Sequence, residues 1–352
     1  MYVCNIEPSK PFMIQFLKYL LFPFSLIYKG ITSLRNLLFE LKVLPTFEPN
    51  IATIGVGNLI VGGTGKTPII DYLISVFPNY KIGIISRGYG RKTKGFLQIG
   101  SKSTPKEVGD EPFMLFTKNQ DKSFFVSEDR VEGLKKALSI QPNLDIILFD
   151  DVFQHRYLKT KVNILLCDYS RPFFDDFLLP TGLLRESKSG AKRADIIIVT
   201  KCPEYISETE RGLLADNIRK YAKNDTPIYF AVFQSLAPSN TENALLSNNS
   251  KVVLISGLAN NKGFKTGLEQ NFEIEKHFEY KDHHDFSKEE IADILRLFPN
   301  SNFVCTEKDF VKIKPLLNPE ILPFFYISTQ KVRIFNEIEL KKEIFERLGF
   351  IY

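Results

Sequence analysis

A glycine-rich turn between an apolar run and an amphipathic stretch is the feature that most constrains this fold. Residues 51–56 read IATIGV, residues 57–68 read GNLIVGGTGKTP, and a helix-like pattern continues to residue 76. A strand, a turn that ends in Gly-Lys-Thr and a helix together form the context of a phosphate-binding loop. We therefore predict that one edge of a sheet binds phosphate, rather than a glycine turn with an incidental surface lysine.

Each residue type in this loop has an expected task. Glycines let backbone N–H groups approach phosphate oxygens, and the following helix N-terminus favours negative charge. The lysine reaches the β- and γ-phosphates, and the threonine hydroxyl ligates Mg²⁺. The phosphate-binding residues predicted here are Gly62, Gly63, Thr64, Gly65, Lys66 and Thr67.

The loop departs from the usual pattern at one position. G-x-x-x-x-G-K-[ST] requires a glycine five residues before Gly65, where this chain has Ile60. We expect Gly62 and Gly63 to supply the flexibility in a reshaped loop.

Apolar runs alternate with amphipathic stretches along the rest of the chain, which predicts an α/β fold with a mostly parallel sheet covered by helices on both faces. Strands are expected at 51–56, 81–85, 123–126, 145–149, 162–166, 195–199 and 227–232, and then at 251–255, 302–305 and 324–328. Helices are expected at 66–76, 111–118, 128–139, 207–222, 287–297 and 336–348. The expected division is a helical segment at 1–45, a phosphate-loop domain at 46–233, a polar linker or hairpin at 234–251 and a smaller α/β domain at 252–352.

Composition excludes several classes of protein. Hydrophobic residues make up 44% and charged residues 25%, which is typical of a globular chain. A net charge of +5, without an arginine-rich stripe, does not favour nucleic acid. The four cysteines form no C-x-x-C pair, so neither a disulfide framework nor a zinc site is expected, and a reducing compartment is favoured.

The first 45 residues are rich in Phe, Leu, Ile and Tyr but are interrupted by Lys18, Pro23, Lys29 and Arg35. No uninterrupted apolar stretch reaches the roughly 18 residues of a spanning helix, and no signal-peptide cleavage site follows the apolar run. A basic, aromatic, broken amphipathic segment is typical of one that lies in a membrane interface. The alternative is a pair of helices packed on the protein's own core.

Two aspartates follow the apolar strand expected at 145–149. In the sequence DIILFDD, Asp150 and Asp151 end the run, as acids beside Mg²⁺ do in phosphoryl-transfer sites, although acids after strands are often only turn residues. A guanine-binding motif of the T-K-x-D type is broken, because VTKCP has Pro203 in place of the acid. The predicted nucleotide is therefore ATP.

Seven motifs, in order along the chain, resemble the tetraacyldisaccharide 4′-kinases, the lipid A 4′-kinases of Gram-negative bacteria. They are VGNLIVGGTGKTP, SRGYGR, GDEP, DDVFQH, LLPTGLLRE, DHHDF and TEKDFVK. The resemblance implies transfer of the ATP γ-phosphate to the 4′-hydroxyl of an acylated glucosamine disaccharide 1-phosphate, with Mg²⁺. The resemblance also implies that the reaction takes place at the cytoplasmic face of the inner membrane. Other phosphate-loop kinases or ligases, or a membrane-associated ATPase switch, are the alternatives.

The resemblance implies a catalytic pair, Asp110 of GDEP as the base and His283 of DHHDF as its partner. A carboxylate suits the first role because a sugar hydroxyl must lose a proton to become a good nucleophile. The local alternative for Asp110 is a helix N-cap, since the helix-like EPFMLF follows it directly. Asp282 and His284 carry a weaker expectation.

The remaining site residues also come from the resemblance. Those implied near the metal and the nucleotide phosphates are Glu111, Asp150, Asp151, Gln154 and His155, and those implied at the lipid head group are Tyr89, Arg130 and Asp175. Arg130 alternatively forms an ion pair on a helix surface. Asp175 stands where the family commonly has asparagine, Leu183 where it has proline and Val152 where it has glycine.

The motif TEKDFVK leaves two interpretations open. Glu307, Lys308 and Asp309 either reach the nucleotide across a cleft or brace the domain interface.

Overall fold

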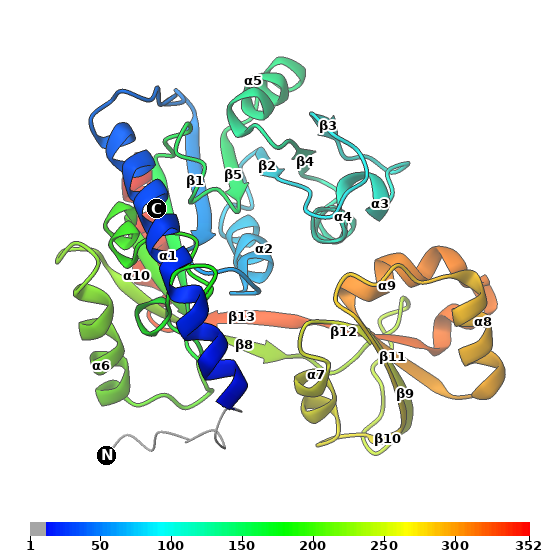
Figure 1. The fold of residues 1–352 in the computed structure, drawn as a ribbon. Helices are drawn as coiled ribbons and strands as arrows, with labels where there is room; N and C mark the ends of the chain where they lie inside the picture. The colour runs from blue at the N-terminus through cyan, green and yellow to red at the C-terminus, as the bar shows by residue number, and fades with distance from the viewer. Residues whose placement is uncertain (1–11) are drawn as a thin grey trace.

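The computed structural model describes the backbone of residues 12–352 and the side chains from Leu20 onward. The described chain forms a nine-stranded, mostly parallel sheet and a separate four-stranded sheet, so the predicted α/β class is confirmed (Figure 1). The large sheet has the strand order β13-β8-β7-β6-β1-β5-β2-β4-β3.

The large sheet contains nine strands within the described residues. Their bounds are β1 Ala52–Asn58, β2 Ile82–Ser86, β3 Leu97–Gln98, β4 Ser123–Val126, β5 Ile146–Asp150, β6 Val162–Asp168, β7 Ile196–Thr200, β8 Ile228–Ser235 and β13 Gln330–Ile334. All seven strands expected before residue 233 are present. Strands β2, β5 and β7 are buried along their whole length, as continuous apolar runs in a parallel sheet should be.

Helices cover both faces of the large sheet. One face carries α2 Lys66–Val76, α4 Asp110–Lys118 and α10 Glu337–Leu348. The other carries α5 Arg130–Ile140 and α6 Glu208–Arg219, while the short α3 Pro105–Val108 precedes α4. Because the central strands are parallel, the phosphate loop after β1 and the acids after β5 lie at the same edge.

The smaller sheet is entirely parallel, with the order β10-β9-β11-β12. Its strands are β9 Lys251–Gly257, β10 Glu273–Tyr280, β11 Asn302–Thr306 and β12 Phe325–Ser328, and its helices are α7 Asn261–Leu268, α8 Lys288–Leu297 and α9 Glu307–Ile313. Helix α9, which follows β11, packs against α4 of the large unit (Figure 1). The carboxyl-terminal side of the small sheet thus meets the helix that begins at Asp110.

The C-terminal residues do not belong to the smaller sheet, contrary to the expected domain at 252–352. Strand β13 pairs antiparallel with β8, and the two strands run side by side from the large unit to the small one (Figure 1). Helix α10 then buries Leu340, Ile344 and Leu348 in the core of the large sheet. The amphipathic pattern at 336–348 predicts a helix but does not specify which sheet its apolar face covers.

The N-terminal segment is a single helix, α1 Phe12–Glu40, which continues through Pro23. Its polar side packs on the protein: Ser25 bonds to the Leu178 carbonyl at 3.1 Å, and Asn36 donates to Glu186 Oε2 at 2.9 Å. Its opposite side exposes apolar residues, namely Leu20, Phe22, Phe24, Leu26, Ile27, Ile31, Leu34 and Leu37. No helix in the described chain combines the length and apolar character needed to cross a bilayer.

Candidate active site

The phosphate loop joins β1 to α2 in a backbone conformation that requires glycine. Gly62 and Gly65 have φ values of 121° and 85°, which L-residues with side chains rarely adopt. A Cβ on Gly65 would lie 2.3 Å from the ring of Phe233 on β8. The loop is therefore held closely between its own helix and the neighbouring strands, with its N–H groups at the start of α2.

Ile60 replaces the expected glycine because this part of the loop forms strand-like contacts. Ile60 bridges antiparallel to Leu184, the Val61 N–H donates to the Leu183 carbonyl at 2.8 Å, and Ile60 itself is buried. The segment LLPTGLLRE is thereby fastened to the phosphate loop. Because Ile60 and Val61 are paired with this segment, we expect phosphate to contact the part of the loop that follows Val61.

The lysine and threonine of the loop each contact a predicted acid. Lys66 Nζ lies 3.6 Å from Asp151 Oδ1, and Thr67 Oγ1 donates to Glu111 Oε2 at 2.7 Å. Arg185 Nη1 binds both oxygens of Asp151, at 3.0 and 3.1 Å. Two cations thus neutralise Asp151, and the charges of Lys66 and Arg185 outweigh the effect of burial and lower the pKa of its carboxyl group.

Asp150 has the opposite environment. It is buried at the end of β5, and its only hydrogen bond from the described side chains comes from Ser86 at 3.3 Å to Oδ2. Burial raises the pKa of Asp150 to about 6, and the nearby charges of Glu111 and Asp151 act in the same direction. Its other oxygen, Oδ1, is buried without a hydrogen-bond partner, which leaves a donor atom available for a cation.

The described residues hold no group of three or more His, Cys, Asp or Glu side chains arranged to bind a metal by themselves. Mg²⁺ usually takes one or two carboxylates and fills its coordination shell with phosphate oxygens and water. The unpartnered Asp150 Oδ1, near Lys66 and Glu111, fits such an ion once a phosphate is present.

Asp110 and His283 come together although they lie on different sheet units. His283 Nδ1 lies 3.1 Å from Asp110 Oδ2. Asp110 is the first residue of α4, and Gly109, not Asp110, occupies the N-cap position, so the helix-cap alternative is not supported. Gly109 has a φ of 95°, and a Cβ there would lie 3.2 Å from Gly88, which shows how closely the SRGYGR turn packs behind the aspartate.

Cations surround the Asp110 carboxylate. Burial alone would raise the pKa of Asp110, but the hydrogen bond with His283 and the charges of Lys312 and Lys308 outweigh it and lower the pKa below its usual value. Asp110 is therefore ionised at neutral pH, as a group that accepts a proton must be. The residues on either side of His283 in the chain have their own partners: His284 contacts Glu290, and Asp282 accepts from Lys308.

Gln154 and His155 follow the two aspartates in the chain. The side chain of Gln154 is hydrogen-bonded, whereas His155 Nε2 is not. Gln154 donates to the Asn58 carbonyl at 2.8 Å and accepts from Arg185 at 3.1 Å, so its amide links the end of β1 to the LLPTGLLRE segment. His155 has a buried Nε2 without a hydrogen bond, and burial, helped by the charge of Arg130, lowers the pKa of His155 to about 4.

Arg130 differs from both expectations stated for it. It is buried rather than exposed, and its guanidinium donates to main-chain carbonyls of Ser127, Glu128, Asp150 and Asp151. These contacts hold the turn after β5, so the side chain has no exposed face for a surface ion pair or for a lipid head group.

Tyr89 and Asp175 are both exposed. The Tyr89 ring centroid lies 5.7 Å from that of His283, which places this residue at the rim of the Asp110 site. Asp175 ends the short 3₁₀ turn Phe173–Asp175, where its N–H donates to the Pro172 carbonyl at 3.2 Å. Its neighbour Asp176 is buried and binds Arg171 and the N–H of Phe177 instead.

Of the following residues at the site, Lys201 and Lys312 were assigned no role by the sequence, and the match to LLPTGLLRE implied for Arg185 and Glu186 only that they order that loop. Arg185 and Glu186 link the phosphate-loop region to α1, Lys201 bonds to the Gly63 carbonyl and to Asp168, and Lys312 reaches Asp110. The spacing of Lys308 and Lys312 is the one available signal, because residues four apart share a helix face.

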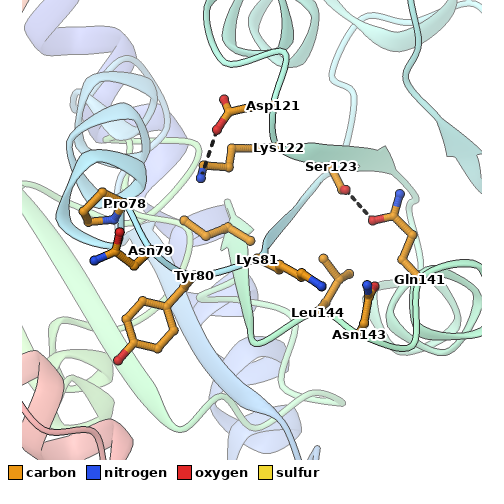
Figure 2. A pocket seen from close by; sticks show the side chains of 11 residues that line it. Pro78, Asn79, Tyr80, Lys81, Asp121, Lys122, Ser123, Gln141, Asn143 and Leu144 are labelled. Atoms are coloured by element: carbon orange, nitrogen blue, oxygen red, sulfur yellow. Dashed lines mark hydrogen bonds and ion pairs between the residues drawn. The ribbon is translucent and has the colours of Figure 1, made fainter.

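A separate hollow of about 610 Å³ lies at the opposite edge of the large sheet (Figure 2). Its lining comes from the segments just before β2, β4 and β5, and includes the Asp121–Lys122 ion pair and the Ser123–Gln141 hydrogen bond. Ligand sites in open α/β sheets lie beyond the carboxyl ends of strands, so this amino-terminal hollow is not the candidate site.

The loop after β1, the acids after β5 and the Asp110–His283 pair define the class of protein, a phosphate-loop phosphotransferase with an α/β fold. The family model described as tetraacyldisaccharide-1-P 4′-kinase matches residues 17–348, and the chain belongs to this family.

Similar proteins cover almost the whole chain. The tetraacyldisaccharide 4′-kinase of Cytophaga hutchinsonii is 39% identical over 350 residues, covering 95% of this chain and 98% of the relative. That of Flavobacterium psychrophilum is 40% identical over 335 residues, covering 94% and 96%. Among solved structures, LpxK from Aquifex aeolicus in complex with ATP has a TM-score of 0.77 at 28% identity and covers 94% of this chain and 99% of that one.

Proposed function

We propose that this protein transfers the γ-phosphate of ATP to the 4′-hydroxyl of an acylated glucosamine disaccharide 1-phosphate, a step of lipid A biosynthesis. Membership of the tetraacyldisaccharide-1-P 4′-kinase family supports this reaction. ATP as the donor is supported by the similar Aquifex aeolicus structure, which was solved with ATP.

The observation that carries the proposal is the position of two consecutive carboxylates at the start of α4. Glu111 binds Thr67 of the phosphate loop, while Asp110 binds His283 of the smaller unit. One helix end thus places an ionised carboxylate next in sequence to the residue that contacts the phosphate loop. This arrangement suits a base that acts on an acceptor hydroxyl next to a bound triphosphate.

The transfer then follows from these positions. Asp110 accepts the proton of the 4′-hydroxyl while the hydroxyl oxygen forms a bond to the γ-phosphorus. The bond between that phosphorus and the β–γ bridging oxygen breaks, and ADP leaves with the bond's electron pair. Lys66 and the loop N–H groups stabilise the charge on the phosphates, and His283 holds the carboxylate of Asp110.

The Thr67 hydroxyl and Asp150 would hold Mg²⁺, with Glu111 beside them. The ion would supply neutralisation of the phosphate charge. Asp151, paired with Lys66 and Arg185, would orient the lysine rather than bind the ion directly.

The exposed apolar side of α1 suits an acceptor that is anchored in a membrane. Its polar side faces the LLPTGLLRE segment, which pairs with the phosphate loop at Ile60 and Val61, so a bilayer against the other side would present head groups near the site. The proposed location is therefore the cytoplasmic face of the bacterial inner membrane, with Tyr89 and Asp175 at the head-group side of the site.

The direct test is transfer of labelled phosphate from ATP to a tetraacylated disaccharide 1-phosphate in detergent micelles, with product identified by mass spectrometry. The wild-type protein should form the 4′-phosphorylated product, and Asp110→Asn and Lys66→Met should lower the rate by about 10³-fold or more.

Hydrolysis of ATP should be measured in parallel. A membrane ATPase switch would hydrolyse ATP without the lipid and tolerate Asp110→Asn, and another small-molecule kinase would ignore the lipid acceptor. Either result would exclude the proposed reaction.

A further inference from the structure

Lys312, on α9 of the smaller unit, is a buried ammonium group that reaches across to Asp110. Its Nζ lies 3.4 Å from Asp110 Oδ2 and 3.3 Å from Asp309 Oδ1, and it donates to the His284 carbonyl at 2.8 Å. Only 6% of its side chain is exposed. A buried charge of this kind is costly unless it is paired, and here three oxygens surround the ammonium group while the ring of Phe286 lies 5.3 Å from it.

The anchor of Lys312 is rigid. Asp309 is fully buried and accepts hydrogen bonds from the Gly257 N–H at 3.0 Å and from Thr306 Oγ1 at 2.8 Å. Gly257 ends β9 and Thr306 ends β11, so Asp309 is fixed to two adjacent strands of the small sheet. Because the ammonium group contacts both Asp309 and Asp110, it fixes the Asp110 carboxylate on α4 relative to the small sheet.

The same face of α9 supports the histidine. Lys308, one helical turn before Lys312, lies 2.7 Å from Asp282 Oδ1 and 3.3 Å from His283 Nε2. One lysine thus contacts the carboxylate and the other contacts its histidine partner. Among the described residues, hydrogen bonds to the Asp110 carboxylate go to Oδ2, and none reaches Oδ1.

We propose that Lys312 is a positioning residue of the phosphoryl transfer: together with His283 it holds Oδ2 of Asp110 and leaves Oδ1 for the acceptor hydroxyl. This inference rests on the proposed role of Asp110 as the base. Lys312 makes no contact with the phosphate loop, so its role concerns the acceptor side of the reaction and not ATP binding.

The test compares Lys312→Met with Lys118→Met in the full-length protein. Lys118 is the matched control, because its Nζ joins Asp71 at 2.6 Å and Glu307 at 3.4 Å, and so also links α4 to α9, but without touching Asp110. We expect Lys312→Met to lower kcat on the order of 10- to 100-fold while KM for ATP changes less than about threefold, since small misplacements of a reacting group have effects of this size. Lys118→Met should keep kcat within about threefold of wild type.

Three results would overturn the inference: wild-type kcat for Lys312→Met, equal losses in both variants, or a rise in KM for ATP with kcat unchanged. Equal losses would mean that Lys312 only fastens the two units. If Lys312→Met does not fold, Lys312→Gln replaces it. Its amide offers donors to the buried oxygens, but it is uncharged and one bond shorter than lysine, so kcat should still fall.

Asp110→Asn, assayed beside these variants, separates the two proposals. An inactive Asp110→Asn with a fully active Lys312→Met would reject only the positioning role. An active Asp110→Asn would reject the base itself, and the positioning role with it.

Discussion

Three aspartates at one edge of the large sheet differ in pKa because their neighbours differ. Two cations pair with Asp151, and His283 with two lysines surrounds Asp110, so both carboxyl groups have lowered pKa values despite burial. Asp150 is buried beside other acids, and its pKa is raised to about 6. Separated pKa values of this kind are typical of sites where acids have distinct roles, which in the proposed mechanism are those of a base for Asp110 and of a cation ligand for Asp150.

His155 gives a prediction about pH and stability. Burial lowers the pKa of His155 from the ordinary histidine value of 6.5 to about 4 in the folded protein. Between these two values the unfolded chain binds a proton that the folded protein does not, so stability is present at higher pH and falls as the pH drops below about 6.5. From about pH 8 to about pH 5 the loss from this residue should be about 2 kcal/mol.

The measurement is the free energy of unfolding by urea at both pH values, for the wild type and for His155→Gln. Glutamine does not titrate, so the variant should lose less stability on acidification. Identical pH dependence in the two proteins would contradict the low pKa of His155.

At the scale of elements, the phosphate loop and α1 share one partner. The LLPTGLLRE segment pairs with Ile60 and Val61 on one side, and its Arg185 carbonyl accepts from Tyr28 of α1 at 2.8 Å on the other. The N-terminal helix is thus connected to the phosphate loop through this segment. Because its polar side makes these contacts, its apolar side is left outward.

Substitutions on that apolar side should weaken membrane binding without affecting the fold. Ile27 and Ile31 are 62% and 63% exposed. Burial of an isoleucine side chain in an apolar phase contributes about 1.5–3 kcal/mol, so the double variant Ile27→Gln/Ile31→Gln should bind anionic phospholipid vesicles at least about tenfold more weakly in a sedimentation assay. Thermal unfolding should be unchanged.

Ile338→Gln on α10 is the matched control, because Ile338 is 62% exposed on another element. Equal loss of vesicle binding in the control, or full binding by the α1 variant, would argue against an interfacial role for this helix.

At the scale of the whole molecule, the chain leaves the large unit through β8 and returns through β13. The small unit is therefore an insertion between two strands that pair with each other. Helix α10 completes the large core, where Phe345 stacks on Phe77 with ring centroids 4.9 Å apart. The large unit is thus built from the segments before and after the small unit in the chain.

This topology predicts where a core substitution in α10 acts. Ile344 is fully buried in the large core, and Ile344→Ala should lower the free energy of unfolding by about 2–5 kcal/mol. Amide hydrogen exchange should accelerate in β1, β6 and α2 but not in β9 or β11. The control Ile294→Ala, in the core of the small sheet, should show the reverse, and faster exchange in the small sheet for Ile344→Ala would contradict the assignment of α10.

Local patterns in the sequence were sufficient for the phosphate loop and for seven of the nine strands of the large sheet, whereas β3 and β13 were not predicted. Apolar runs and the GGTGKT turn depend on residues close together in the chain, and helix 66–76 was predicted with its observed bounds. Strand β10 was missed because EIEKHFEY is an edge strand with many charged residues and no continuous apolar run.

The sequence alone determined the class of fold, the phosphate loop and, through seven short motifs, the family. Only the tertiary structure decided which sheet α10 covers, that Arg130 holds a turn, and that Lys312 touches Asp110. The physical reason is the range of the interactions. Strand and helix periodicity and turn chemistry are set by near neighbours, whereas a buried ion pair between two units depends on how the whole chain brings the carboxyl ends of two sheets together.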